Sequence, residues 1–479
     1  MSHWGTAFPR LRIAHIGLLC AVVAVASCRH VPSAPIDPGV NARRLAARSL
    51  DNSAVKAALT SYGLTVPASP SWSLDQLTVA AWTLRPDVAL ARSEVEAAKA
   101  NIVVQGKRPN PTLSLSPERV IANAAGANPW VIATSLALPI ETAGKRGIRR
   151  ARAAAMERAA EWQLGAALWS ARASVRAALL ARDLAAKTVA LDDREAGIRA
   201  DYRDWIETRI KFGAATNQDR LVASQALAEV ESRRGSDRAS LAAATANLAA
   251  AVGLRTDVFA ATSPTYPDLE GLPDFTDADL ARMRDAALVN RADIRRSLAE
   301  YDVAEQDLKA AVAKQYPDIG FGPGYLFDQG AHKITLTVDF PVPLFDNGGA
   351  AIDAAVAARK VAAARFDDVQ AAALGTIDSS FARYQATLKA VASARDAEAE
   401  ARRNYETTNR VLTAGGGDRG SLLTAEIDLV TRLRNTLVAE TAAVDAVTAL
   451  ENAVERPVFP ASSLQTVGAV AEKSHEATP

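Results

Sequence analysis

One stretch, Gly106–Arg150, decides how the chain folds, and it reads GKRPNPTLSLSPERVIANAAGANPWVIATSLALPIETAGKRGIRR. Residues 112–116 alternate small polar and leucine side chains, and residues 131–138 form a second, mainly apolar run, as β-strands do. Prolines at 109, 111 and 139 separate these runs from helical patterns on both sides. The stretch therefore predicts a pair of short strands within a mainly helical chain.

The composition favours packed helices. The chain has 479 residues, long enough for more than one domain, and a formal net charge of +1. A near-neutral chain implies no nucleic-acid partner. Aromatic residues make up only 5% of the chain, and alanine is abundant in the helical parts, which suits closely packed helices.

The N-terminus resembles a targeting signal. Two arginines precede a short apolar run at 13–25, and Val25-Ala26-Ser27-Cys28 follows, as in bacterial lipoprotein signals. Residues 1–27 would then be removed and Cys28 lipidated. The alternative is an ordinary secretory signal with a chance cysteine. Cys20, the other cysteine, lies in the removed part, so the mature chain would hold no disulfide.

The rest of the chain contains one unit twice. Residues 28–73 are rich in proline, with a short helical piece around 41–59, and we expect a peripheral arm outside the core. The first unit, 74–254, contains a helix, the two strands, a long helix at 145–211, a turn at 212–217 and a return helix at 218–251. A coiled-coil rhythm of apolar residues marks the long helix, which would span roughly 100 Å.

The second unit, 277–455, follows a proline-rich linker at 255–276 and precedes a tail at 456–479. Arg291-Ala292-Asp293 matches Arg85-Pro86-Asp87, and Gly348 matches Gly144. Its predicted parts are strands at 319–325 and 333–340, helices at 350–412 and 421–454, and a turn at 415–417. The chain is therefore a duplicated helix–strand–strand–helix–helix unit.

The second strand pair indicates a membrane. Ile334, Leu336, Val338 and Phe340 alternate with polar side chains, the pattern of a lipid-facing strand in a β-barrel. The alternative is a small half-buried sheet that caps a helical domain. The very long flanking helices and the lipoprotein-like signal favour the membrane. Four strands cannot close a barrel in lipid, so three copies would have to share a twelve-stranded one.

In these features the sequence resembles the TolC-type outer-membrane efflux channels, and among them the cation-efflux (CusC/CzcC-like) branch. The resemblance covers roughly residues 70–455, and its matching residues are Arg85-Pro86-Asp87, Lys107–Leu113, Pro139-Ile140-Glu141, Gly144-Lys145-Arg146, Pro341–Phe345 and the two glycine turns. It implies a homotrimer, mainly α with a small transmembrane β part, whose β-barrel continues as a long α-helical periplasmic barrel. It also implies an exit duct docked to a periplasmic adaptor protein and a proton-driven inner-membrane transporter.

The resemblance assigns roles to the two turns. They would form the inner tip that meets the adaptor, and their residues are Gly213, Ala214, Thr216, Gly415, Gly416 and Gly417. The alternative is a pair of tight helix connections. Family members often carry acidic residues just after the second turn, where this chain has Ser421 and Thr424. The candidate gate carboxylates are therefore Asp219, Asp418 and Glu426, and the alternative is that they are solvated turn residues.

A basic cluster starts the first long helix, where cations oppose the helix dipole. It comprises Lys145, Arg146, Arg149 and Arg150, with Arg152 close behind. We expect contact with anionic outer-membrane headgroups, and the alternative is a solvated basic face. Gly415, Gly417 and Gly420 also spell a Gly-x-Gly-x-x-Gly motif. No strand precedes this motif, which argues against nucleotide binding.

The sequence predicts neither enzyme nor cofactor. The five histidines, His3, His15, His30, His332 and His475, have no metal-ligand partner at helical spacing, so no metal site is expected. We expect a passive exit channel of an outer-membrane efflux pump for small solutes, either metal cations or drugs. The alternatives are a lipid-anchored periplasmic coiled-coil scaffold without a pore and the exit duct of a type I protein secretion system.

Overall fold

The structure is a computed structural model that describes residues 30–67, 70–122, 128–259, 262–264, 266 and 271–458. The signal segment and Cys28 lie outside the described residues. The chain divides into two compact units after Arg48. In the first unit, α2 (Pro38–Ala46) begins at Asp37, whose carboxylate accepts a hydrogen bond from the backbone N–H of Val40.

The segment expected to lie outside the core contributes to it. One helical piece was predicted around 41–59, but the structure has two helices, α2 and α3 (Ser53–Ser61), and α3 belongs to the second unit. Val55 and Leu59, four residues apart on α3, are fully buried in the main hydrophobic core. The prediction of a purely peripheral arm is wrong at these residues, because one helical turn places both side chains on one face.

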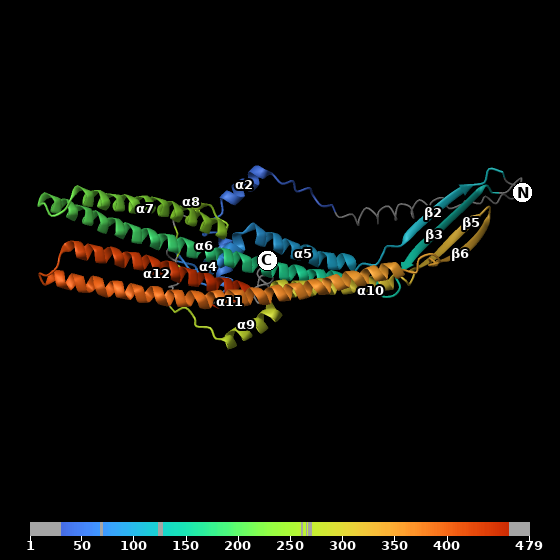
Figure 1. The fold of residues 1–479 in the computed structure, drawn as a ribbon. Helices are drawn as coiled ribbons and strands as arrows, with labels where there is room; N and C mark the ends of the chain where they lie inside the picture. The colour runs from blue at the N-terminus through green and yellow to red at the C-terminus, as the bar shows by residue number, and fades with distance from the viewer. Residues whose placement is uncertain are drawn as a thin grey trace, which may run out of the picture. The chain divides into compact units, whose positions relative to one another are not determined.

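The two repeats contain equivalent elements (Figure 1). The first repeat comprises α4 (Leu74–Leu84), α5 (Pro86–Gln105), β2 (Thr112–Arg119), β3 (Trp130–Ile140), α6 (Lys145–Lys211) and α7 (Asn217–Val252). The second comprises α9 (Asp277–Asn290), α10 (Ala292–Ala313), β5 (Ile319–Asp328), β6 (Ala331–Asp339), α11 (Gly349–Thr413) and α12 (Arg419–Val454). The segment predicted as a linker also holds α8 (Thr256–Phe259) and β4 (Ser263–Pro264), and β4 pairs in parallel with β1 (Ser71–Trp72).

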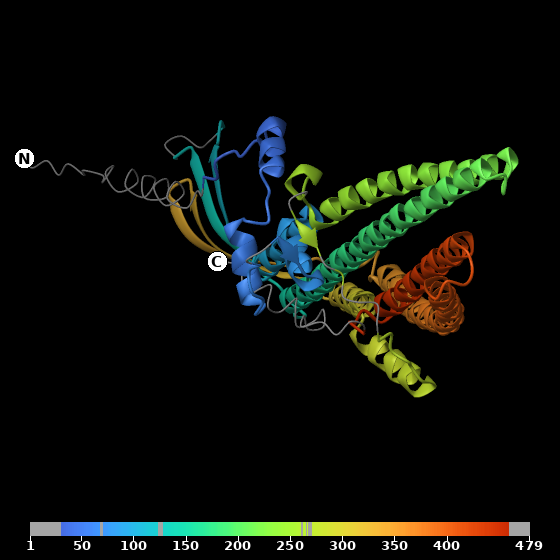
Figure 2. The same ribbon diagram turned by 90° about the vertical axis from the view of Figure 1, so that its left-hand side faces the viewer.

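The long helices form two hairpins. α6 runs beside α7 and α11 beside α12, and the strands lie at the end of these helices opposite the turns (Figure 1, Figure 2). Gly144 and Gly348 precede α6 and α11 with φ of 68° and 80°, a conformation that glycine adopts without strain. No helix in the described part of the chain is both long and apolar enough to cross a membrane.

β2 and β3 are longer than predicted, because two prolines are tolerated. Pro117 lies within β2, at the edge of the sheet, where a missing N–H need not cost a ladder bond. Pro139 lies within β3, but β2 ends opposite Ala137, so this proline removes no bond from that pair. Phe340, predicted within the last strand, lies one residue beyond the end of β6.

The duplicated Arg-x-Asp motif has the same structural role in both repeats. Arg85 pairs with Asp87 and donates to the carbonyl of Ala251, near the end of α7. In the second repeat, Arg291 pairs with Asp293 and donates to the carbonyl of Ala453, near the end of α12. Each arginine therefore ties the start of a short helix to the end of the return helix of its own repeat.

Candidate functional site

The four-stranded sheet carries most of its large apolar side chains on one face. Its strand order is β2-β3-β5-β6, and all neighbours are antiparallel. Residues directly opposite each other in such a sheet point to the same side. The register aligns Leu113 with Leu136, Leu138 with Phe321, and Phe321 with Val338. One face therefore carries Leu113, Leu115, Leu136, Leu138, Phe321, Tyr325, Ile334, Leu336 and Val338.

This apolar face is exposed in the single chain. Ile334 is 92% exposed and Leu336 is 63% exposed, far more than a half-buried sheet would allow. The opposite face is mainly small or polar, with Ser114, Ser135, Gly320, Gly322, Gly324, Thr335 and Thr337, although Val131 and Leu326 also lie on it. β2 and β6 are the two edge strands, with one hydrogen-bonded neighbour each. An exposed apolar face with two open edges is an incomplete structure.

The basic cluster at the start of α6 is partly neutralised within the chain. Lys145 donates to Asp318 at 2.8 Å and to the carbonyl of Tyr316 at 2.6 Å, which ties α6 to the start of β5. Arg149 pairs with Glu141, and Arg152 pairs with Asp307 on α10. Arg146 donates to the carbonyl of Gly106, and its side chain is exposed, as is that of Arg150. These carboxylates therefore offset part of the unfavourable interaction between the basic side chains and the positive end of the α6 dipole.

The turn between α6 and α7 is tightly capped. Gly213 has a φ of 69°, and Arg209 donates to the carbonyl of Ala214 at 3.3 Å. Thr216 and Asp219 form a reciprocal capping box at the start of α7. Hydrogen bonds from the backbone N–H and hydroxyl of Thr216 hold the pKa of Asp219 below its usual value.

The turn between α11 and α12 is built similarly. Gly415 and Gly417 have φ of 84° and 82°. Asp418 caps α12, accepting from the hydroxyl of Ser421 at 2.8 Å and from the backbone N–H of Gly420 at 2.7 Å, and these bonds lower its pKa. Two of the three candidate gate carboxylates, Asp219 and Asp418, therefore act as helix caps at the hairpin ends.

The third candidate, Glu426, lies in the seam, the line of contact between α6 and α12. It pairs with Arg194 of α6 at 3.1 Å. On the same two helices, Ile198 packs with Leu423 and Val430. These contacts join the first hairpin to the second, a connection that sequence periodicity alone does not reveal.

Buried charged side chains join the helices of the seam at a level further from the turns. Asp192 of α6 is fully buried and accepts from Arg233 of α7 and Arg434 of α12. Arg434 also donates to Asp237 of α7 at 2.7 Å, so three helices meet at one guanidinium.

A second buried cluster lies closer to the sheet. Glu451 of α12 is fully buried and pairs with Arg172 and Arg176 of α6. The sequence interpretation missed both clusters, because a charge that faces a neighbouring helix looks locally like one that faces water.

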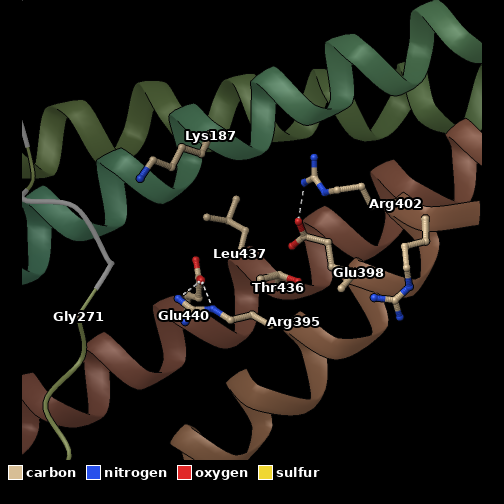
Figure 3. Close-up of a pocket in the computed structure, with 10 residues that line it drawn as sticks. Lys187, Gly271, Arg395, Glu398, Arg402, Thr436, Leu437 and Glu440 are labelled. Atoms are coloured by element: carbon tan, nitrogen blue, oxygen red, sulfur yellow. Dashed lines mark hydrogen bonds and ion pairs between the residues drawn. The ribbon is translucent and has the colours of Figure 1, made fainter. Parts of the chain in front are cut away.

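Between these clusters α6 separates from α11 and α12 to leave a hollow of about 800 Å³ (Figure 3). Two ion pairs line it: Arg395 with Glu440 at 2.6 Å, and Arg402 with Glu398 at 2.8 Å. Lys187 faces it from α6 and pairs with Asp183. No group of three or more potential metal ligands occurs among the residues that the structure describes.

One family model matches most of the chain. The family described as "Outer membrane efflux protein" (OEP) matches residues 77–254 and 283–455. A comparison with curated proteins finds no match.

Solved structures share the fold. VceC from Vibrio cholerae is 20% identical, with a TM-score of 0.64 over 80% of this chain and 95% of that one. CmeC from Campylobacter jejuni is 15% identical, with a TM-score of 0.65 over 93% and 97%. CusC is also 15% identical, with a TM-score of 0.63 over 83% and 96%. At these identities the likeness establishes the fold alone.

Proposed function

The chain belongs to the outer membrane efflux protein family, and from this we propose that it is the outer-membrane exit channel of a tripartite efflux pump. Members of this family are outer-membrane channels, and they are not enzymes. In the proposed role the channel is passive, and a periplasmic adaptor and a proton-driven inner-membrane transporter supply cargo to it.

The observation that carries the proposal is the incomplete sheet. An apolar face across four strands suits lipid, and the polar face suits a water-filled lumen. Open strand edges are not tolerated in lipid, so β2 and β6 need partners from other copies. Three copies supply about twelve strands, enough to close around a lumen. The chain's own duplication supports this arrangement, because β3 already pairs with β5 across the two repeats.

The helical hairpins would extend the lumen through the periplasm. Their turns, at Gly213–Thr216 and Gly415–Gly417, lie opposite the sheet and would meet the adaptor. The exposed Arg146 and Arg150 lie where strands meet helices, and we assign them to anionic headgroups. Replacing both with glutamine should weaken outer-membrane retention, and unchanged retention would contradict this assignment.

Two further assignments belong to the same proposal. Cys28 would anchor each copy by lipid, and Cys28→Ser should abolish incorporation of labelled palmitate. A ring of three Asp418 carboxylates would favour cations at the closed end. Asp418→Asn should then lower cation over anion preference, measured as a shift in reversal potential, and an unchanged potential would leave Asp418 as a helix cap alone.

Cargo is proposed as small solutes, either metal cations or drugs, and the cation-efflux branch is favoured by the sequence resemblance. A deletion strain should become sensitive to one of these groups, and complementation with the intact gene should restore resistance. Conductance of the purified protein in planar bilayers tests the pore itself. A protein that never conducts would favour a periplasmic scaffold, and loss of a secreted protein in the deletion strain would favour type I secretion.

A further inference from the structure

Arg172, in the buried cluster closer to the sheet, has hydrogen-bond donors that the protein does not use. Arg172 is 2% exposed, and its Nη1 donates to Glu451 of α12. Its Nε and Nη2 are also buried, and no group in the described part of the chain accepts a hydrogen bond from either of them. These two N–H groups share one edge of the planar guanidinium, and such an edge suits an anion that accepts both bonds. A complete anion-binding edge therefore lies unpaired in the protein interior.

The indole of Trp169 adds a third unpaired donor next to Arg172. The two residues are three positions apart on α6, so their side chains are neighbours on one face of the helix. The guanidinium carbon of Arg172 lies 5.3 Å from the ring centroid. Trp169 is 7% exposed, and its N–H has no acceptor among the described residues. Buried donors almost always have a partner, so three of them in one place point to a bound acceptor.

The cluster also carries an excess of positive charge. Arg172 and Arg176 share the single carboxylate of Glu451, which is fully buried. The Nε of Arg176 donates to a neutral partner, the hydroxyl of Tyr266, at 3.3 Å. Within the described ranges, Glu451 is the only carboxylate that forms an ion pair with Arg172. A buried charge that is not fully balanced is costly, so an anion at Arg172 would stabilise the cluster.

A further carboxylate near the cluster does not remove this excess at Arg172. Burial raises the pKa of Asp445 on α12, whereas the charges of Arg383 and Arg176 lower it. Asp445 is exposed, and its interactions are with these two arginines. The unpaired edge of Arg172 and the unpaired indole N–H thus keep their need for an acceptor.

We propose that the Nε–Nη2 edge of Arg172 and the indole N–H of Trp169 bind a small monovalent anion, such as chloride, in the interior beside the contact of α6 with α12. The anion accepts from three donors and balances the second guanidinium of the cluster. A water molecule would satisfy the donors but would leave the charge unbalanced, which favours the anion. The anion stabilises the packing of α6 and takes no part in export, so the site does not depend on the proposed channel function.

Two substitutions remove the site without creating a new buried charge. Arg172→Met removes the charge and both donors, and leaves Arg176 with a carboxylate of its own. Trp169→Phe removes one donor and keeps an aromatic ring. Arg194→Met is the matched control, because Arg194 also lies on α6 and pairs with a carboxylate of α12, but is exposed. Unheated gel migration verifies assembly of each variant, and Trp169→Phe carries the test if Arg172→Met fails to assemble.

The first measurement is the thermal unfolding midpoint of the purified full-length protein in detergent, at one scan rate. Sodium chloride is compared with sodium gluconate, a larger organic anion, at equal ionic strength. Chloride at about a hundred times its dissociation constant should raise the wild-type midpoint by roughly 3 °C. Trp169→Phe should show a smaller shift and Arg172→Met none, whereas Arg194→Met should keep the wild-type shift.

The second measurement locates the ion. Crystals grown with bromide in place of chloride should give an anomalous peak beside Nε and Nη2 of Arg172 in the wild type, and none there in Arg172→Met. Peaks confined to the surface would show an adventitious ion only and would overturn the site.

Three other results would overturn the site as well. They are equal wild-type midpoints in the two salts, a full chloride shift in Arg172→Met or Trp169→Phe, and density beside Arg172 without an anomalous signal, as a buried water would give. The channel is tested separately by conductance in planar bilayers, and a protein that conducts without any chloride shift would lose the anion site alone.

Discussion

A single charge on the apolar face of β6 should block assembly, whereas the same charge on the neighbouring residue should not. Leu336 lies near the middle of β6 on the apolar face, opposite Pro323, and Thr337 lies on the polar face, opposite Gly322. Leu336→Arg would place a guanidinium in lipid. Thr337→Arg would place it in the lumen, above a residue without a side chain.

The magnitude follows from the position of the strand. β6 has nine residues, so it is about 30 Å long and rises about 21 Å across the membrane at a tilt of ~45°. Leu336 is then close to the bilayer midplane, where arginine costs about 2–4 kcal/mol per copy. Three copies raise the cost to roughly 6–12 kcal/mol, or at least about four orders of magnitude in the assembly equilibrium.

The assay is the amount of heat-modifiable trimer in purified outer membranes, normalised to total expressed protein. Leu336→Arg should give almost no trimer and Thr337→Arg a wild-type amount. Leu336→Met, which keeps the apolar character, controls for packing. Equal trimer from both arginine variants would refute the assignment of the two faces.

Three further predictions concern stability. Glu451→Gln leaves Arg172 and Arg176 buried without a counter-charge and should lower the free energy of unfolding by about 3–5 kcal/mol. Glu440→Gln should cost at most about 1 kcal/mol, because its partner Arg395 is half exposed. Equal losses of the two variants in denaturant melts would contradict this prediction. Gly253→Ala should lower the free energy of unfolding by at least about 1 kcal/mol, because Gly253 has a φ of 89° and a Cβ there would lie 3.3 Å from the backbone of Leu84. Gly235→Ala should cost less, because a Cβ at Gly235 meets open space. A comparable loss for both variants would count against the close approach at Gly253. Hydrogen bonds from Thr276 and Arg282 hold the pKa of Asp279 at about 2, below its unfolded value of ~3.9. The contribution of Asp279 to the free energy of unfolding is therefore present above pH ~4 and is lost as the pH falls towards 2. Asp279→Asn should reduce the loss of stability between pH 5 and pH 3, and an unchanged loss would show that Asp279 is not responsible.

Helix ends could be predicted from the sequence, because their signals are local. Gly144 before α6 and Thr216 before α7 placed these boundaries within one residue of the structure. The alternation in residues 333–339 agrees with the register of β6, which puts Ile334, Leu336 and Val338 on one side of the sheet. Strand ends were less certain, because whether a proline ends a strand depends on its neighbours. Pro139 lies within β3 at a point that β2 does not reach.

Contacts between distant segments could not be predicted. Glu451 and Asp192 resemble any charged residue on a helix, and only the packing of α6 against α12 shows that both are buried. The sequence shows Gly420 only as a glycine near a turn. A side chain does not fit there because the indole of Trp205, in the other hairpin, occupies the space. Asp219 and Asp418 lie at the hairpin ends and are occupied as caps, whereas Glu426 lies in the seam.

The two open edges of the sheet have a consequence for the cell. A chain that is complete only among three copies cannot mature alone, so the yield of channels should fall steeply when expression is low. Assembly from three copies also makes a defective chain dominant over the normal one. If half of the chains carried a substitution that spoils any trimer containing it, only about one eighth of random trimers would be free of it. A strain expressing both forms should therefore lose most of its export, although it still makes the normal protein.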